Sequence, residues 1–568
     1  MNEAKQLKLD ERPVVDRIMG IDLGTTNSAV AIYDSGMVPQ LCPMGKERKS
    51  TMPSCVMWTG SDNFIVGTEA YEKRYMPNVC YSVKRLMDDA NNEVKLTLES
   101  GESRVFSPVQ ISAEILKALA KNVEMYYGKQ TKCIITVPAY FNQVQIENTI
   151  EASKLAGLDC IQILKEPTSA SYVYSTLGYA TGGSVLVYDL GGGTFDATYM
   201  DFIKKSDIPK TMISALRRMY GIELEKDFDD VTSLYYCQVK GTYGDTRLGG
   251  DDVDTELALA SMKGAGVKLS KKGFEELKLN CESFKRSGAF GMEFTVEDHQ
   301  ISVTQEKLEA AYRKIFNKTM SLLNTMGKEA LDSIKTIVLV GGSTKSEYIP
   351  RFLAERFPNK EISRVLDPDS TVALGAGTVA KDLNQGKALP YRDVLPMAIG
   401  VLLNETKVDV CVPSNSPLPT ATDRTLYTMV DNQEAISLKI YQGIYSEPER
   451  CTYLGLLRIP NIPKRNAGDV SVKVSFMLSS QGRLTIVANC DGVETPVELI
   501  VDSIFNVAKA SMNGSIEFKP VDDFEEGFAD IIDSNPKVLE LIEKRRAALK
   551  SGDTNKVEEL EMSILEAM

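Results

Sequence analysis

Short apolar runs that end in polar, glycine-rich turns recur along the first two thirds of the chain. Residues 185–188 lead into Asp189-Leu-Gly-Gly-Gly-Thr-Phe-Asp196, residues 19–21 into Asp22-Leu-Gly-Thr-Thr-Asn-Ser28, and residues 336–340 into Gly341-Gly-Ser343. Aliphatic and β-branched runs of this length are typical of buried strands. The pattern therefore predicts three strands that are each followed by a tight turn.

The triple glycine is suited to holding a phosphate, because glycines let the backbone aim several N–H groups at one anion. Asp189 and Asp196 would repel a bare phosphate, so a hydrated Mg²⁺ between them and a nucleotide explains their presence. A triple glycine alone is as often a plain flexible turn. The near copy at Asp22, about 170 residues earlier, favours the nucleotide site and predicts an internal duplication into two lobes.

Beyond residue 395 the apolar period changes to two. Residues 436–440, 472–476 and 484–488 alternate apolar and polar side chains between turn signals, which predicts an antiparallel β-sandwich. Residues 383–393 separate the two patterns and contain Gly386 and Pro390, so they predict a linker. After the sandwich, two helical segments flank Ser551-Gly552 and predict one helical hairpin.

Composition narrows the function. The 568 residues are 43% hydrophobic and 25% charged, which is enough for several cores. A net charge of −13 argues against a general nucleic-acid binder. The ten cysteines include no Cys-x-x-Cys pair, which gives little support to a zinc site or to a disulfide framework. The single histidine is His299, so a Ser-His-Asp mechanism is excluded unless His299 itself takes part.

The sequence also has no targeting or membrane signal. Residues 1–17 mix basic and acidic side chains and contain no apolar stretch of signal-peptide length, and no run approaches the roughly 20 apolar residues of a membrane span. We therefore expect a cytoplasmic protein without membrane partners.

Further motifs occur in a fixed order with the glycine turns: Gly20-Ile-Asp-Leu-Gly-Thr-Thr-Asn-Ser28, Ile135-Thr-Val-Pro-Ala-Tyr-Phe-Asn142, Glu166-Pro-Thr168, Tyr188-Asp-Leu-Gly-Gly-Gly-Thr-Phe-Asp196, Gly244-Asp-Thr-Arg-Leu-Gly-Gly250 and Val340-Gly-Gly-Ser-Thr344. In these motifs the chain resembles the seventy-kilodalton heat-shock chaperone family, the DnaK type, from about residue 18 to about residue 500. The resemblance implies an α/β two-lobed actin-like nucleotide-binding domain, a β-sandwich peptide-binding domain and a short α-helical C-terminal segment.

The resemblance also implies domain boundaries. The ATPase domain spans 18–383, with lobe I at about 18–182 and lobe II at about 183–383. The linker is 384–394, the substrate-binding sandwich 395–504 and a short helical lid 505–568. Residues 202–231 form an insertion that the resemblance does not explain. A helix from Pro209 to Gly221 in it is either packed on lobe II or a docking element for a partner.

The implied cofactors are ATP or ADP and Mg²⁺, with K⁺ as a further candidate. The implied catalytic residues are Lys84, Glu166, Thr194 and Asp196, and Asp22 and Asp189 hold the metal through water. The implied nucleotide contacts are Gly24, Thr25, Thr26, Asn27, Gly191, Gly192, Gly193, Thr194, Gly249, Gly250, Glu282, Lys285, Arg286, Gly341, Gly342, Ser343, Lys345 and Asp369. Without the resemblance, Lys84 is an ordinary surface lysine, and the i, i+3, i+4 spacing of Glu282, Lys285 and Arg286 is a salt-bridged solvent face.

For the sandwich, the resemblance implies a groove for an extended apolar peptide. Val401, Ile436 and Leu438 line its pocket, and Asn404 and Met429 take the positions of the arch over the peptide. The implied partners are unfolded or client polypeptides, a J-domain co-chaperone and a nucleotide-exchange factor.

Several positions depart from the family pattern. Ile146 and Ile150 replace charged relay residues, Gln162 and Lys165 replace residues that the family uses toward J-domain partners, and the linker reads Leu389-Pro-Tyr-Arg392. Of these departures, Ile146, Ile150 and Pro390 predict weak docking of the linker on the nucleotide domain and a coupling of about 1 kcal/mol or less.

Two functions fit the sequence. The first is an ATP-dependent chaperone that hydrolyses ATP and binds extended apolar peptides. The alternative is a weakly hydrolysing, nucleotide-sensing protein that binds a dedicated client or exchanges nucleotide. A sugar kinase of the same two-lobed superfamily is less suitable, because the sandwich has no place in it.

Overall fold

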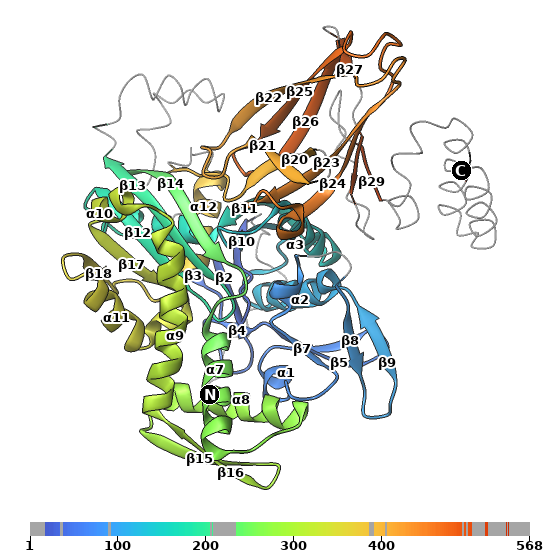
Figure 1. Ribbon diagram of the computed structural model, residues 1–568. Helices are drawn as coiled ribbons and strands as arrows, with labels where there is room; N and C mark the ends of the chain where they lie inside the picture. Colours follow the sequence, from blue (N-terminus) through green and yellow to red (C-terminus); the bar gives the residue numbers. More distant parts are fainter. Residues whose placement is uncertain are drawn as a thin grey trace, which may run out of the picture. The chain divides into compact units, whose positions relative to one another are not determined.

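The computed structural model describes residues 17–33, 38–88, 92–204, 207, 235–385, 391–403, 406–490, 493–495, 498–501, 517–520, 541 and 544. Contacts divide the chain into two compact units (Figure 1). Unit 1 runs to Pro396 and includes Asn415–Leu418, and unit 2 contains Met397–Ser414 and the chain from Pro419 onward. Asn404, residues 208–231 of the insertion and most of 505–568 lie outside the described residues.

Unit 1 is built around two six-stranded sheets. The first has the order β11-β10-β1-β2-β3, with β4 also paired to β2, and the second has the order β18-β17-β12-β13-β14-β19. Their strands are β1 (Met19–Asp22), β2 (Asn27–Ile32), β3 (Gln40–Leu41), β4 (Met52–Pro53), β10 (Lys132–Val137), β11 (Asp159–Lys165), β12 (Gly183–Leu190), β13 (Phe195–Lys204), β14 (Tyr235–Asp245), β17 (Thr336–Val340), β18 (Glu361–Ser363) and β19 (Tyr391–Arg392).

The two sheets repeat one topology. Strand β1 is antiparallel to β2 and parallel to β10, which is parallel to β11. In the same way, β12 is antiparallel to β13 and parallel to β17, which is parallel to β18. Each Asp-Leu-Gly turn therefore joins the first two strands of its sheet, as an internal duplication requires.

Helices cover these sheets, and their ends follow local sequence signals. The longer helices are α2 (Pro108–Tyr127), α3 (Gln143–Leu155), α4 (Glu166–Thr176), α7 (Gly250–Ala265), α8 (Lys271–Ser287), α9 (Gln305–Asn324), α11 (Tyr348–Arg356) and α12 (Thr371–Asn384). Helix α3 begins after Asn142, whose side chain accepts a hydrogen bond from Gln145 N in a capping box. Helices α7 and α8 end at Gly266 and Gly288, both with a φ of 68°.

Unit 1 also contains short elements. They are α1 (Thr68–Glu72), β5 (Cys55–Gly60), β6 (Asn63–Val66), β7 (Val79–Tyr81), β8 (Val94–Thr97), β9 (Ser103–Phe106), α10 (Lys328–Ser333), the hairpin β15 (Gly291–Val296) and β16 (His299–Thr304), and the 3₁₀ helices η2 (Val83–Leu86) and η4 (Gly342–Lys345). No helix of the described ranges is long and apolar enough to cross a membrane.

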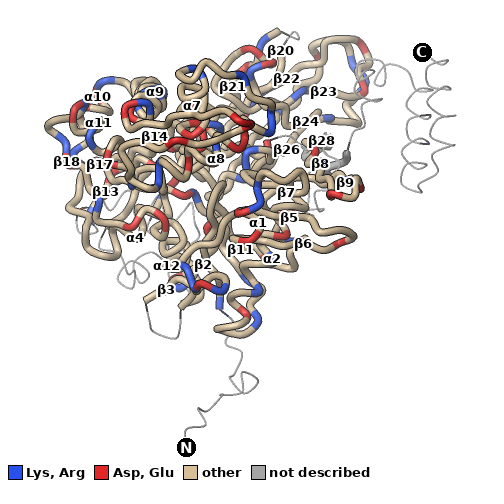
Figure 2. The backbone as a smooth tube through the Cα atoms, turned by 90° about the horizontal axis from the view of Figure 1, so that it is seen from below, with Lys and Arg blue, Asp and Glu red and all other residues tan. Residues whose placement is uncertain are grey.

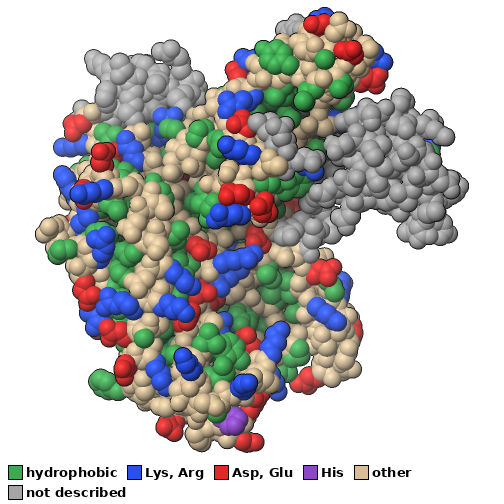
Figure 3. All heavy atoms as spheres, viewed as in Figure 1, with side chains coloured by type: hydrophobic (Ala, Val, Ile, Leu, Met, Phe, Trp, Pro, Cys, Tyr) green, Lys and Arg blue, Asp and Glu red, His purple; other side chains and the backbone are tan. Residues whose placement is uncertain are grey.

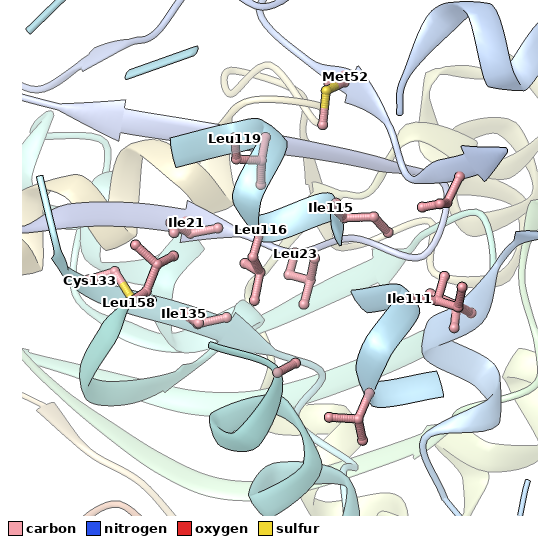
Figure 4. Packing of buried hydrophobic residues seen from close by; sticks show 14 of the residues in the cluster. Ile21, Leu23, Met52, Ile111, Ile115, Leu116, Leu119, Cys133, Ile135 and Leu158 are labelled. Atoms are coloured by element: carbon pink, nitrogen blue, oxygen red, sulfur yellow. The ribbon is translucent and has the colours of Figure 1, made fainter. Parts of the chain in front are cut away.

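The core of the first sheet explains one departure from the family pattern. Ile21 and Ile135 from the strands pack with Ile115 and Leu119 of α2 (Figure 4). Ile146, on α3, is buried in the same cluster. An apolar residue at 146 therefore fills core volume, where a charged side chain would lose its hydration.

Helix α12 packs back onto β1, the first strand of the unit. The approach is so close that a Cβ added at Gly20 would lie 2.1 Å from Gly377 N. Glycine is therefore required at position 20, where the strand lies directly against the helix backbone.

The linker does dock as a strand, and the expectation of weak docking is corrected on this point. Tyr391 and Arg392 form β19, which pairs in parallel with Cys237 and Gln238 of β14. Pro390 lies outside the described residues, and the pairing is formed by Tyr391 and Arg392.

Unit 2 contains two further sheets. One has the order β21-β20-β23-β24-β28-β29 and the other β22-β25-β26-β27. Their strands are β20 (Ala398–Leu403), β21 (Lys407–Val412), β22 (Thr420–Tyr427), β23 (Ile436–Gly443), β24 (Thr452–Ile459), β25 (Ser471–Leu478), β26 (Leu484–Cys490), β27 (Val493–Thr495), β28 (Glu498–Val501) and β29 (Glu517–Pro520), with the 3₁₀ turn η5 (Pro448–Arg450) between β23 and β24.

Alternate residues of these strands are buried, as the period of two predicts. In β25, Val472, Val474 and Phe476 are buried and the residues between them are exposed or half-buried. Strand β29 lies inside the segment 505–568, which was predicted to be a helical lid. It pairs in parallel with β28, which precedes that segment.

Candidate nucleotide site

A cavity of about 490 Å³ lies in unit 1 where the two sheets present their Asp-Leu-Gly turns. Its volume is in the range of small-molecule and cofactor sites. It is lined by Asp22, Gly24, Thr25, Thr26, Asn27, Lys84, Glu166, Asp189, Gly191, Gly192, Thr194, Gly250, Asp251, Glu282, Lys285, Arg286, Tyr312, Gly341, Gly342, Ser343, Lys345, Ser346, Pro368, Asp369 and Val372.

Most residues predicted from the sequence therefore meet around one cavity. Three do not line it. Gly193 accepts a hydrogen bond from Arg85 Nε at 2.9 Å, and Gly249 packs so tightly that a Cβ there would lie 2.5 Å from Gly192 O. Asp196 lies behind the surface, where its Oδ1 accepts a hydrogen bond from Tyr140 N at 3.0 Å.

Five lining residues were missed in the sequence. Asp251, Ser346, Pro368 and Val372 lie within three residues of predicted positions, so a wider window around each motif would have included them. Tyr312, on α9, has no such neighbour and sits in an ordinary amphipathic helical pattern. It could be found only from the fold.

The two glycine turns touch each other directly. A Cβ added at Gly192 would lie 1.9 Å from the Oγ1 of Thr26, so only glycine allows the turns to approach this closely. Gly341 has a φ of 81°, and a Cβ there would lie 2.4 Å from an oxygen of Asp189. The backbones of three turns thus form a cradle that side chains would fill.

Three buried carboxyls lie at this cradle. Burial raises the pKa of Asp22 to about 7, and the nearby Glu166 adds to the effect while Lys84 opposes it. Burial also raises the pKa of Asp196 to about 7, again with Glu166 as the next cause. The same causes raise the pKa of Asp189 well above its usual range. The site as folded therefore has too little positive charge for its carboxyls.

One lysine enters the cradle. Lys84 lies on η2, and its Nζ donates to Glu166 Oε1 at 2.6 Å in a buried ion pair. The ammonium also lies 5.4 Å from the centroid of the Phe141 ring. Lys84 is thus a buried residue at the end of the cavity that the glycine turns form, and it is not a surface lysine.

The far end of the cavity is formed by α8. Arg286 pairs with Glu282 at 2.6 Å, and Tyr71 and Arg74 bind the same carboxylate. Burial alone would raise the pKa of Glu282, but Arg286, the Tyr71 hydrogen bond and Arg74 outweigh it and lower the pKa. Glu282 is therefore a charged acceptor at the position predicted for a ribose.

Lys285 and Lys345 are also committed to carboxylates. Lys285 pairs with the buried Asp254 at 2.7 Å. Lys345 pairs with Asp369 at 2.6 Å and with Asp367 at 3.1 Å. A base bound beside Lys345 would therefore meet an ion pair, not a free cation.

The predicted peptide residues lie in unit 2. Val401 of β20 and Ile436 of β23 are buried, and Leu438, two residues after Ile436 on β23, is half-buried. Met429 is 83% exposed, in the loop after β22. Alternating apolar residues of this kind are more often core than pocket, so their role stays a prediction.

The donor set fits a hydrated divalent cation with a nucleotide. Asp22 and Asp189 offer only oxygen ligands, which Mg²⁺ prefers, and a cation would offset the burial that raises their pKa. The buried Oγ1 of Thr26 has no partner within the described part of the chain and faces this space.

Comparisons with known proteins agree with this geometry. The model of the family described as "Hsp70 protein" matches residues 18–205 and 235–559. A heat shock protein of Pyricularia oryzae is 31% identical in an alignment 530 residues long that covers 84% of this chain and 80% of that protein. The chaperone protein HscA homologs of Pseudomonas fluorescens and Pasteurella multocida are 31% and 30% identical, over 85% and 87% of this chain and 77% and 80% of their own lengths.

Two sheets of the same topology, with their glycine turns around one cavity, are typical of a nucleotide-binding protein. Within that class it belongs to the Hsp70 family, which confirms the resemblance seen in the motifs. Family members bind ATP or ADP with Mg²⁺, and this membership supports a chaperone role for the chain.

Proposed function

We propose that the protein is an ATP-dependent molecular chaperone that hydrolyses ATP at the cavity of unit 1 and binds extended apolar peptides on unit 2. The observation that carries the proposal is the buried pair of Lys84 and Glu166 at a cavity lined by both Asp-Leu-Gly turns. A structural ion pair would need no glycine cradle beside it.

Each group of residues around the cavity has a separate role in the proposed phosphoryl transfer. The backbone of the glycine turns holds the phosphates, and Lys84 holds the attacking water and offsets charge that develops in the transition state. Glu166 orients Lys84 and accepts the proton of the water, with Thr194 at the cavity wall and Asp196 behind it. When bound, Mg²⁺ would supply positive charge between the phosphates, and Asp22 and Asp189 would hold it through water.

Nucleotide selectivity would come from α8 and from the turn after β17. Glu282 is a charged acceptor for the ribose, and Arg286 offers a flat guanidinium to the base. Lys345 offers no flat surface and is already paired with Asp369, so we expect moderate affinity for adenine.

Unit 2 would supply the peptide site. Its two sheets support the β-sandwich interpretation, and the exposed Met429 is available to lie over a peptide. The buried Val401 and Ile436 would form the floor under Leu438. An extended peptide would be held by backbone hydrogen bonds and by one side chain in this pocket.

The face seen in Figure 3 shows no cluster of basic side chains that would indicate a nucleic-acid site. Lys and Arg are interspersed there with Asp and Glu, and the tube view of Figure 2 shows the same mixture from below. Nucleic-acid binding uses a clustered basic patch instead.

The alternative function is a nucleotide sensor that hydrolyses little and serves a dedicated client. It is favoured by one feature, since Gln162 and Lys165, which replace the family's J-domain contacts, are both buried. A J-domain partner and an exchange factor remain part of the proposal, but such a partner would have to bind through other residues.

Single-turnover hydrolysis separates the two functions. The full chain is mixed with substoichiometric Mg-ATP, and phosphate release is followed with and without an extended apolar peptide. A chaperone should hydrolyse measurably and faster with peptide. Tight ATP binding without hydrolysis under either condition would favour the sensor.

A further inference from the structure

Each carbonyl of the triple-glycine turn accepts a hydrogen bond from another part of unit 1. Gly191 O accepts one from Gly250 N at 3.0 Å. Gly192 O accepts one from Asp251 N at 2.7 Å. These two donors are the backbone N–H groups of the first two residues of α7. The first two glycines are therefore fixed to the N-terminal end of that helix.

The third glycine is held by a side chain from a different element. Arg85 Nε donates to Gly193 O at 2.9 Å. Arg85 Nη2 pairs with Asp252 Oδ2 at 2.7 Å, and the same oxygen accepts a hydrogen bond from Gly249 N at 2.7 Å. The fork of one guanidinium thus joins the carbonyl of Gly193 to the first turn of α7.

The direction of the Gly193 carbonyl fixes the direction of the next N–H group. In a trans peptide, the C=O of one residue and the N–H of the following residue point in opposite directions. Because Gly193 O points to Arg85, the N–H of Thr194 points away from Arg85. Thr194 lines the cavity, whereas Gly193 does not. This arrangement favours an N–H of Thr194 that is directed toward bound phosphates.

Arg85 also directly follows Lys84 in the chain. Both lie on η2, whose Val83 is buried in the core cluster of the first sheet. Lys84 pairs with Glu166 of α4, which follows β11 of the same sheet. Arg85 instead reaches the turn between β12 and β13 of the second sheet. These two neighbouring side chains together set how far the ammonium of Lys84 lies from the glycine turn.

We propose that Arg85 is a positioning residue for hydrolysis, which aims the N–H of Thr194 at the phosphates and fixes the distance of Lys84 from the same turn. Arg85 is not one of the residues that line the cavity, so it acts through these two groups and does not touch the nucleotide. Donors that are oriented in advance stabilise the charge that develops in the transition state. This inference rests on the proposed hydrolysis and adds to it the residue that orients the phosphate turn.

The experiment measures single-turnover hydrolysis of Mg-ATP by the full chain, with protein in excess so that binding does not limit the rate. Arg85→Ala should slow hydrolysis about tenfold or more, because small misplacements of reacting groups have effects of this size. The Arg85 side chain is 21% exposed, so a small cation can reach its place. Millimolar guanidinium chloride should raise the rate of Arg85→Ala at least about threefold, since the ion can donate to the Gly193 carbonyl, and should not raise that of the unchanged chain.

The affinity for adenosine separates positioning of the phosphates from a general loosening of the cleft. Adenosine has no phosphate, so its affinity for Arg85→Ala in calorimetric titration should stay within about threefold of that for the unchanged chain. A cleft that had loosened as a whole would lose adenosine together with hydrolysis, and this result would overturn the proposal.

Two controls separate the contact with Gly193 from the ion pair. Asp252→Asn removes the charged partner but leaves the hydrogen bond between Arg85 and Gly193, so its hydrolysis rate should stay within about threefold of the unchanged chain. Arg247 forms an exposed ion pair at 2.5 Å with Asp88, which lies just after η2, and does not touch the glycine turn. Arg247→Ala should hydrolyse ATP within about twofold of the unchanged rate.

A rate of Arg85→Ala within about twofold of the unchanged chain would overturn the proposal, and so would an Asp252→Asn variant that is slowed as much as Arg85→Ala. If Arg85→Ala does not fold, as judged by circular dichroism, Arg85→Met decides in its place. An unchanged chain that binds Mg-ATP without hydrolysing it would contradict the proposed function instead. The affinity for Mg-ATP then replaces the rate, and it should fall about fivefold or more in Arg85→Ala while the affinity for adenosine is retained.

Discussion

The ammonium of Lys84 lies 2.6 Å from the carboxylate of Glu166, and both side chains are almost fully withdrawn from water. They come from separate elements, η2 and the first turn of α4. A buried pair of this kind contributes little net stability on its own, because desolvation offsets most of the attraction. Its place at a phosphate cradle points to chemistry, and this can be tested.

Lys84→Ala should retain ATP binding but lose hydrolysis by about 10²-fold or more, because preorganised charge at a phosphoryl group is typically worth that much. Single-turnover phosphate release and equilibrium binding of a fluorescent ATP analogue give the two quantities. Lys117→Ala is a matched control, since Lys117 forms an exposed ion pair with Glu114 on α2. Equal turnover in Lys84→Ala and the unchanged chain would remove its catalytic role.

Hydrolysis should depend strictly on Mg²⁺. Asp22→Asn and Asp189→Asn should each raise the Mg²⁺ concentration needed for half-maximal activity. Each variant removes a negatively charged carboxylate that would hold the ion through water. The measurement is a Mg²⁺ titration of the hydrolysis rate. Full activity in excess EDTA would show that no divalent ion takes part.

The stability of the nucleotide-free protein should fall as pH rises. Asp22 and Asp196 have a pKa of about 7 when folded and about 3.8 when unfolded, so the folded state binds more protons between these values. For each carboxyl, this difference lowers the free energy of unfolding by on the order of 4 kcal/mol. The loss begins above about pH 4 and is complete above about pH 7.

Asp196→Asn should therefore raise the melting temperature of unit 1 at pH 7.5 and flatten its dependence on pH. The exposed Asp62 gives the control, since Asp62→Asn should leave the slope unchanged. Thermal unfolding without nucleotide, from pH 4.5 to 8, is the measurement. A melting temperature of the unchanged chain that rises through this range would contradict the burial argument.

The contact between the glycine turns can be tested by one methyl group. Gly192→Ala places a Cβ 1.9 Å from Thr26 Oγ1, so the turns must separate, and we expect nucleotide affinity to fall about tenfold or more. In Gly264→Ala, on α7, the new methyl meets only the flexible end of Lys307, at 3.2 Å. Calorimetric titration with ADP should show normal affinity for the control, and equal affinity for Gly192→Ala would show that the turns do not need this approach.

One hydrogen bond to the docked linker can be removed by deleting a single oxygen atom. Gln162 Nε2 donates to the hydroxyl of Tyr391 at 2.6 Å. Because one hydrogen bond is worth about 1 kcal/mol, Tyr391→Phe should reduce the effect of ATP on peptide affinity by roughly fivefold at most. Fluorescence anisotropy of a labelled peptide with ATP and with ADP measures this effect, and Tyr445→Phe, in a loop of unit 2, is the comparison.

Much of the site was predictable because its signals are local. The turns after residues 22, 189 and 340 are short motifs whose glycines indicate the backbone geometry directly. Asp251 and Ser346 were missed although each directly follows a predicted position, Gly250 and Lys345 respectively. Tyr312 follows no such position, because its place at the cavity depends on how α9 crosses the unit.

The linker was misjudged for a related reason. Its sequence contains Pro390 and few apolar residues, and strand propensity alone argues against docking. The structure uses backbone pairing with β14, the Gln162 side chain and Thr168 instead, none of which can be seen within the linker itself. The strength of its coupling to peptide binding stays a prediction.

The contact between Gly20 and Gly377 has a consequence for synthesis of the chain. Strand β1 leaves the ribosome early, but the helix that covers it follows about 350 residues later, which is roughly 20–70 s at typical elongation rates. During that interval one face of the first sheet lacks α12 and exposes apolar side chains to water. The nascent chain therefore carries an uncovered apolar surface until its nucleotide unit is complete.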